Sequence, residues 1–166
     1  MSKRTKKPSS APWVLAAGAG LVMAASGVTG GAESGAAAAT KPAAKTSTGS
    51  GSVVAQAAYD AGFRGERLVL SIAVAKAESG YKPKAHLRNG PTKGCPNGST
   101  DRGIWEINDC YHPKVSNACA YDVACNAKAA FKISNGGKNW KPWSSFNAGK
   151  HLPFISEARN LAAGVS

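Results

Sequence analysis

Two carboxylates in contrasting settings are the residues of this chain best suited to chemistry. Glu78 ends an apolar segment whose spacing predicts a helix, and the residues three and four positions back are Ala75 and Val74. Such neighbours solvate an ionised carboxylate poorly and raise its pKa. Asp101 follows a polar turn at 97–100. One acid on an apolar helix and another on a wet turn can hold different protonation states at one pH, which cleavage of a glycosidic bond requires.

The elements that must position these acids are mostly helical. Apolar spacing predicts three helices that end at glycine-containing turns, over residues 53–61, 65–79 and 123–134. Asp122 has the position of an N-cap for the third helix. Residues 100–108 alternate enough in polarity to predict short strands, and a final short helix is expected from about Pro153. The expected fold class is therefore α+β, mainly α, with the folded domain over 53–166.

The N-terminal part of the chain has the composition of an export signal. Four basic residues lie within the first seven positions, and residues 8–32 carry no charge. Residues 1–39 therefore predict a cleaved secretory signal, with an uncleaved membrane anchor as the alternative because the uncharged stretch is nearly long enough to span a bilayer. Residues 40–52 are rich in Thr, Ser, Gly, Ala and Lys, which predicts a flexible linker.

The net charge of the chain restricts its partners. The formal charge is +12, and residues 1–45 contain six Lys or Arg and one Glu, so the remainder carries 12 − 5 = +7. This surplus suits a polyanion such as nucleic acid, an anionic membrane surface or an anionic cell wall. Solubility alone is the alternative explanation for the charge. Export argues against nucleic acid and favours the wall.

The cysteines agree with export. The chain has four, all in the folded part and without a Cys-x-x-Cys pair: Cys95, Cys110, Cys119 and Cys125. Four cysteines permit three connectivities. Local pairing, Cys95 with Cys110 and Cys119 with Cys125, is the predicted one because each bond closes a short loop rich in turn residues. In the chain-entropy account a loop of about 15 residues contributes roughly 3 kcal/mol.

Four segments together resemble a known family. They are residues 78–85, 98–108, 119–127 and 140–146. The first two resemble the lysozyme superfamily, both the animal-type lysozymes and the lytic transglycosylases, and the later two resemble a branch found in actinobacteria and their phages. Glu78 alone could be a solvated glutamate near a helix end, but the order and spacing of the four segments favour a functional role.

The resemblance implies a helical lobe packed on a short β-hairpin, with a cleft that binds alternating aminosugars. Carried over by position, Glu78 matches the catalytic acid and Asp101 the second carboxylate of animal-type lysozymes. The implied reaction is hydrolysis of the β-1,4 bond between N-acetylmuramic acid and N-acetylglucosamine in peptidoglycan. One alternative is a lytic transglycosylase that uses Glu78 alone and forms 1,6-anhydro products. Another is a non-catalytic wall-binding or virion structural module.

Further residues near the two acids are candidates for substrate binding: Trp105, Glu106, Asn108, Trp143 and Phe146. Trp105 is expected equally in the protein core and in the wall of the cleft. The resemblance implies that Asn108 orients groups near Glu78. Glu106 stands where the family usually has Gln. A third acid there could raise the pKa of Glu78 further or pair with a nearby Arg or Lys.

No cofactor and no metal is expected. The three histidines lack metal-ligand spacing: His86, His112 and His151. The expected partner is peptidoglycan in an anionic wall, and the expected form is a monomer. The protein is expected to be secreted or wall-associated, with an outward-facing membrane anchor or a phage virion or lysis protein as alternatives.

Overall fold

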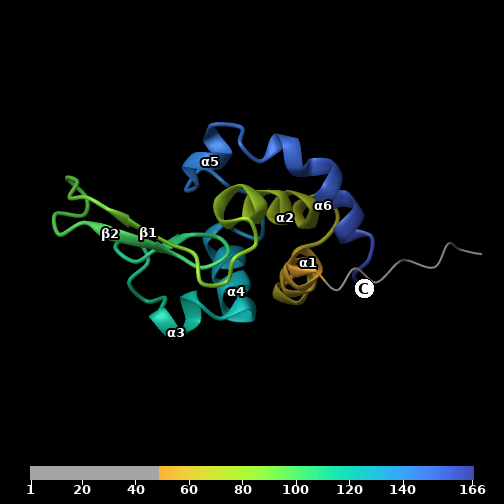
Figure 1. The fold of residues 1–166 in the computed structure, drawn as a ribbon, viewed down its shortest axis with the longest axis horizontal. Coiled ribbons are helices and arrows are strands. Elements are labelled where there is room, and N and C mark those ends of the chain that lie inside the picture. Colours follow the sequence, from red (N-terminus) through yellow and green to blue (C-terminus); the bar gives the residue numbers. More distant parts are fainter. Residues whose placement is uncertain (1–48) are drawn as a thin grey trace, which may run out of the picture. The chain divides into compact units, whose positions relative to one another are not determined.

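The computed structural model describes residues 49–166, which form a helical body with a small sheet (Figure 1). The α-helices in this part are α1 (Ser50–Ala61), α2 (Glu66–Ser79), α3 (Asn117–Ala120), α4 (Val123–Ile133), α5 (Ser144–Asn147) and α6 (Ile155–Ala162). A 3₁₀ turn, η1, spans Leu152–Phe154, and the strands are β1 (His86–Asn89), β2 (Ser99–Arg102) and β3 (Ile107–Asn108). The predicted signal or anchor at 1–39 lies outside the described residues, as does most of the predicted linker.

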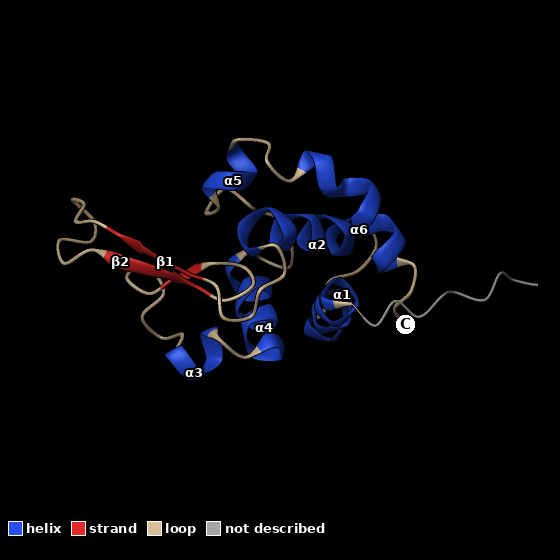
Figure 2. Cartoon of the chain, in the orientation of Figure 1, coloured by secondary structure: helices blue, strands red, loops and turns tan. Residues whose placement is uncertain are grey.

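The α+β, mainly α prediction is confirmed (Figure 2). The helices predicted over 53–61, 65–79 and 123–134 correspond to α1, α2 and α4. The side chain of Asp122 accepts a hydrogen bond from the Cys125 backbone N–H, which is the predicted N-cap. Within 49–166 none of the helices combines the length and the apolarity that crossing a bilayer demands.

Helix α2 lies at the centre of the core and carries Glu78 at its end. Its predicted apolar face is buried at Leu68, Ile72 and Ala75, and its other faces are largely buried as well because α1, α5 and α6 pack around it. Each large apolar side chain buried in this way contributes roughly 1.5–3 kcal/mol. The helix ends at Gly80, whose φ of +61° is a left-handed conformation that glycine adopts without steric cost. The core therefore fixes the turn that bears Glu78.

Helix α1 begins at Ser50, within the predicted linker and before the expected boundary at residue 53. The reason is tertiary packing. A Cβ placed on Gly51 would lie 3.0 Å from the Leu161 side chain and 3.1 Å from the ring of Tyr81, so the glycine allows these side chains to pack closely against the start of the helix. The helix is extended by contacts with the C-terminal segment, which the composition of the linker does not reveal.

The three strands form one antiparallel sheet in the order β1-β2-β3. Asp101 lies at its centre, opposite Leu87 on one side and Asn108 on the other. Strands β2 and β3 confirm the prediction for residues 100–108. Strand β1 was not predicted, because three of its four side chains are exposed and it has no apolar alternation.

Both predicted disulfides are present, and the described residues include no free cysteine. The Cys95–Cys110 bond joins the loop between β1 and β2 to the segment after β3. The Cys119–Cys125 bond joins α3 to α4. The two bonds therefore fasten the parts of the chain that have few apolar residues to bury.

Reduction of the disulfides is expected to lower the melting temperature by roughly 10 °C or more. The loop of about 15 residues between Cys95 and Cys110 alone contributes roughly 3 kcal/mol in the chain-entropy account, and each 1 kcal/mol shifts Tm by about 4–8 °C in a domain of this size. Calorimetry with and without reductant measures the shift. A Cys95→Ser/Cys110→Ser variant should reproduce most of it without reductant, and an unchanged Tm in that variant would contradict the expectation.

Candidate active site

A cleft of about 500 Å³ brings the three acids of the sequence motifs together. Glu78 reaches it from the end of α2, Asp101 from the centre of β2, and Glu106 from the turn before β3. The other residues that line the cleft are Ile107, Asn108, Tyr111, His112, Ile133, Pro142, Trp143 and Ser144. The wall is thus part apolar and part acidic.

Glu78 is half-buried and accepts a hydrogen bond from the Ser145 hydroxyl through Oε1. Burial raises the pKa of Glu78, the Ser145 hydrogen bond opposes this, the Asp101 charge raises the pKa and Lys150 lowers it. The net direction is upward, which favours a carboxylic acid that still holds its proton. This is the state that a general acid needs before it reacts.

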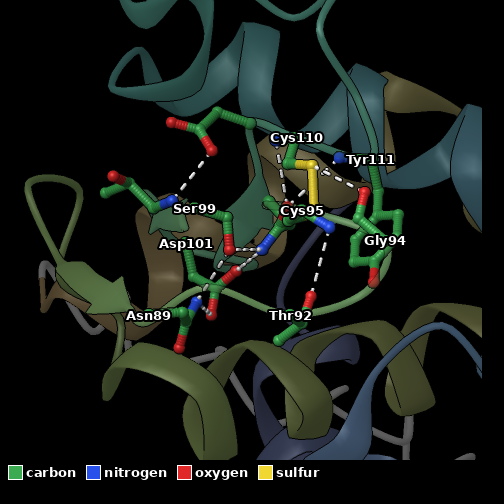
Figure 3. The surroundings of a disulfide bond; sticks show 11 residues. Asn89, Thr92, Gly94, Cys95, Ser99, Asp101, Cys110 and Tyr111 are labelled. Atoms are coloured by element: carbon green, nitrogen blue, oxygen red, sulfur yellow. Dashed lines mark hydrogen bonds between the residues drawn. A yellow bond between two sulfur atoms is a disulfide. The ribbon is translucent and has the colours of Figure 1, made fainter. Parts of the chain in front are cut away.

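Asp101 is set in a different environment (Figure 3). The side-chain amide of Asn89 donates a hydrogen bond to Oδ2 at 2.8 Å, and that of Asn108 donates to Oδ1 at 2.7 Å. Both oxygens therefore act as acceptors, which is the role of an ionised carboxylate. The two neighbouring strands hold the carboxylate between them.

Asn108 acts mainly as a support for Asp101. Its amide also donates to Ser99 Oγ at 2.9 Å, and its Oδ1 accepts hydrogen bonds from the backbone N–H groups of Cys110 (3.0 Å) and Tyr111 (3.2 Å). Its hydrogen bonds are to the sheet and the disulfide segment, so among the groups near Glu78 the one that Asn108 orients is Asp101. The Cys95–Cys110 bond lies directly beside this network in Figure 3.

Glu106 is the most perturbed of the three acids. Burial raises its pKa to about 7, with further contributions from the charges of Asp101 and then Glu78. Its Oε2 atom is buried and has no hydrogen-bond partner within residues 49–166. The pairing with Arg or Lys considered above is absent from the salt bridges of this part of the chain. The sequence suggested that Glu106 would raise the pKa of Glu78. In the structure the neighbouring carboxyls raise the pKa of Glu106 itself.

The aromatic candidates divide between the cleft and the core. Trp143 lines the cleft, and its indole N–H donates to the Trp105 carbonyl at 2.7 Å. Trp105 is fully buried and donates to the Ser71 carbonyl at 3.0 Å, so its role is in the core. Phe146 is half-buried and stacks on His151 with 4.5 Å between ring centroids. Neither Trp105 nor Phe146 is among the residues that line the cleft, so the structure does not bring them together with the three acids.

The residues of the site that were not predicted include Asn89, Tyr111, His112 and Ser145. Asn89 was interpreted only as part of a turn, and Ser145 only as part of a segment that carried the resemblance. His112 lines the cleft, and burial followed by the Arg102 charge lowers its pKa, which favours the neutral form of its ring. None of these residues has a sequence spacing that relates it to Glu78.

The described part of the chain contains no group of three His, Cys, Asp or Glu residues arranged to hold a metal ion. What the arrangement can do is proton transfer and charge stabilisation. It places a carboxyl whose pKa is raised and an amide-held carboxylate around one cleft.

A comparison with protein families gives a match to this chain. The model of a family described as a lysozyme-like domain matches residues 55–145, which is more than half of the chain and includes all three acids of the cleft. No curated protein and no solved structure matches the chain.

Proposed function

We propose, from the premise that this chain belongs to the lysozyme-like domain family, that it hydrolyses the bond between N-acetylmuramic acid and N-acetylglucosamine in peptidoglycan. Domains of this family generally act as glycosidases or lytic transglycosylases. The observation that carries the proposal is the pairing of Glu78, whose pKa is raised, with an amide-held Asp101 around one cleft. Two carboxyls with different environments are the basis of glycosidic bond cleavage.

The proposed reaction begins with proton transfer from Glu78 to the glycosidic oxygen. As the bond breaks, positive charge develops on the sugar ring, and the Asp101 carboxylate stabilises or traps that centre. Water then completes the hydrolysis, with Glu78 acting as the base. Asn89 and Asn108 hold Asp101 in place, and Ser145 holds the Glu78 carboxyl.

A lytic transglycosylase is the second candidate, and one observation favours it. Both oxygens of Asp101 already accept hydrogen bonds from amides, which lowers the reactivity of the carboxylate as a nucleophile. In that reaction Glu78 acts first as acid and then as base, and a hydroxyl of the sugar itself closes a 1,6-anhydro ring. Asp101 would then have only an electrostatic role.

The experiment that tests the proposal is digestion of purified peptidoglycan followed by mass spectrometry. A hydrolase releases fragments with reducing muramic acid ends, whereas a transglycosylase releases anhydro fragments that are lighter by one water. An intact polymer after prolonged incubation would contradict both enzymatic readings and support a non-catalytic wall-binding or virion structural module.

The excess of positive charge is expected to make wall binding sensitive to salt. We propose that the protein acts outside the cell at an anionic wall, because its disulfides suit an oxidising compartment and residues 46–166 carry a net charge of +7. Binding should fall about tenfold between roughly 0.05 M and 0.5 M NaCl, since the Debye length is about 10 Å at 0.1 M salt and shortens further. Sedimentation of a Glu78→Gln variant with purified walls separates binding from cutting. Salt-insensitive binding would indicate sugar stacking as the main source of affinity.

A further inference from the structure

The conformation of Glu106 carries a free-energy cost. Its φ of +46° is in the left-handed region, which residues other than glycine adopt rarely and at a cost of order 1–3 kcal/mol. Its Oε2 atom is buried without a partner within 49–166, and a buried unpaired polar atom also costs free energy. Strain and an unsatisfied polar atom on one cleft-lining residue point to a function of its side chain.

Glu106 lies in a turn, residues 103–106, that is held by contacts with other parts of the chain. The turn therefore cannot shift to relieve the strained backbone of Glu106. Gly103 has a φ of +76°, and a Cβ at this position would lie 1.9 Å from the Ala120 carbonyl oxygen. Four hydrogen bonds with other parts of the chain hold the backbone of the turn: Gly103 N to Ala85 O (2.8 Å), Ser79 Oγ to Ile104 O (2.8 Å), Trp105 N to Asn126 Oδ1 (3.0 Å) and Trp143 Nε1 to Trp105 O (2.7 Å). The fold therefore fixes the backbone from which the Glu106 side chain reaches the cleft.

The charged groups that face Glu106 are acidic. Glu78 from α2 and Asp101 from β2 line the same cleft, and both raise the pKa of Glu106. Tyr111 and His112, from the segment after β3, line it as well. An ionised Glu106 would therefore place a further negative charge beside these two carboxyls.

No cation described in the structure offsets such a charge. Lys150 acts on Glu78, whose pKa it lowers, and is not among the influences on Glu106. Arg102 precedes the turn, but its guanidinium donates to Asn117 Oδ1 at 2.7 Å and to the Ile107 carbonyl at 3.4 Å. With no cation and with Oε2 lacking a donor, the neutral form of Glu106 is the less costly one.

We propose that Glu106 acts as a neutral carboxylic acid in the cleft and donates a hydrogen bond to an acceptor oxygen of the bound glycan, such as an N-acetyl carbonyl. This inference rests on the proposed function, because it takes the glycan as the ligand of the cleft. The same donor makes glycan affinity dependent on pH. Affinity is complete while Glu106 is protonated and is lost as the pH rises through about 7, the pKa to which burial and the neighbouring carboxyls raise this group.

The test uses the full chain with Glu78→Gln, which binds glycan without cutting it and removes the titration of Glu78. Calorimetry measures binding of soluble peptidoglycan glycan strands at about pH 5.5 and about pH 8.5. We expect affinity at least tenfold weaker at the higher pH, because affinity falls up to about tenfold per pH unit above the pKa of the free group. In Glu78→Gln/Glu106→Gln the loss should shrink to less than about threefold, since glutamine keeps an N–H donor but does not ionise.

A second measurement needs no change at position 106. At about pH 7.5, binding to the Glu78→Gln protein should take up protons, detected as a binding enthalpy that varies with the ionisation enthalpy of the buffer. The inference would be overturned if glycan affinity fell equally with pH in both variants, or if it did not fall in the Glu78→Gln protein. Absence of binding at pH 5.5 or of proton uptake would overturn it as well. If walls are lysed normally by the unmodified protein in any of these cases, the proposed function survives, whereas lysis by Glu78→Gln would overturn that function separately.

Discussion

Replacing Glu78 by glutamine is expected to reduce lysis of purified cell walls by about two to four orders of magnitude, which is the usual contribution of a general acid. Glutamine has nearly the shape of a protonated glutamate and keeps an oxygen that accepts the hydrogen bond from Ser145. It cannot deliver a proton to the glycosidic oxygen. The loss of turbidity of a wall suspension measures the rate, and thermal unfolding checks that the variant is folded.

Glu66→Gln is the matched control for this variant. Glu66 lies at the other end of α2, is exposed, and pairs with Arg159 on the surface. Exposed ion pairs contribute about 0–1 kcal/mol, so this substitution should leave both folding and lysis nearly unchanged. Lysis by Glu78→Gln within tenfold of the unmodified protein would reject Glu78 as the acid.

Asp101→Asn is expected to impair lysis nearly as strongly as Glu78→Gln if the enzyme is a retaining hydrolase. In that class the two carboxyls stand about 5–5.5 Å apart and the second one stabilises or traps the positive centre on the sugar. Asparagine is neutral, and its amide group would face the amide donors of Asn89 and Asn108. Lysis rates with mass spectrometry of the products measure both the loss and the type of reaction.

Asp60→Asn controls for the change of charge. Asp60 lies on α1, accepts a hydrogen bond from the Gln56 side chain and does not line the cleft. A melting curve separates loss of chemistry from disruption of the sheet around Asp101. A mild effect of Asp101→Asn together with a digest dominated by anhydro fragments would overturn hydrolysis in favour of transglycosylation.

The larger elements of the fold could be predicted because their residues repeat with the period of a helix and end at Gly or Asn. The short helices α3 and α5 have four residues each, which is too few for a periodic pattern. Strand β1 is exposed on most of its length and is held by pairing with β2, and the start of α1 is held by the C-terminal segment. These elements depend on partners distant in the sequence, so local patterns do not reveal them.

The two principal acids could be predicted from residue type and local setting, and the structure brings both to one cleft. The residues that hold these two acids in place could not be predicted in this way. Asn89 contacts Asp101 because strands β1 and β2 pair in a particular register. Ser145 contacts Glu78 although it lies 67 residues later in the sequence. Trp105 and Phe146 were assigned to the cleft from the sequence but do not line it. The sequence of a motif does not distinguish an aromatic residue that lines a cleft from one that packs in the core.

The distance along the chain between Glu78 and its hydrogen-bond partner determines when the site is completed. Ser145 follows Glu78 by 67 residues, and Trp143 follows Trp105 by 38. Synthesis at about 5–20 residues per second makes the acid roughly 3–13 seconds before the serine. During that interval the cleft lacks the segment that holds Glu78 and the turn of Glu106. A nascent chain that has not reached residue 145 therefore lacks the hydrogen bond that holds the Glu78 carboxyl, so the cleft is completed only after this segment is made and docked.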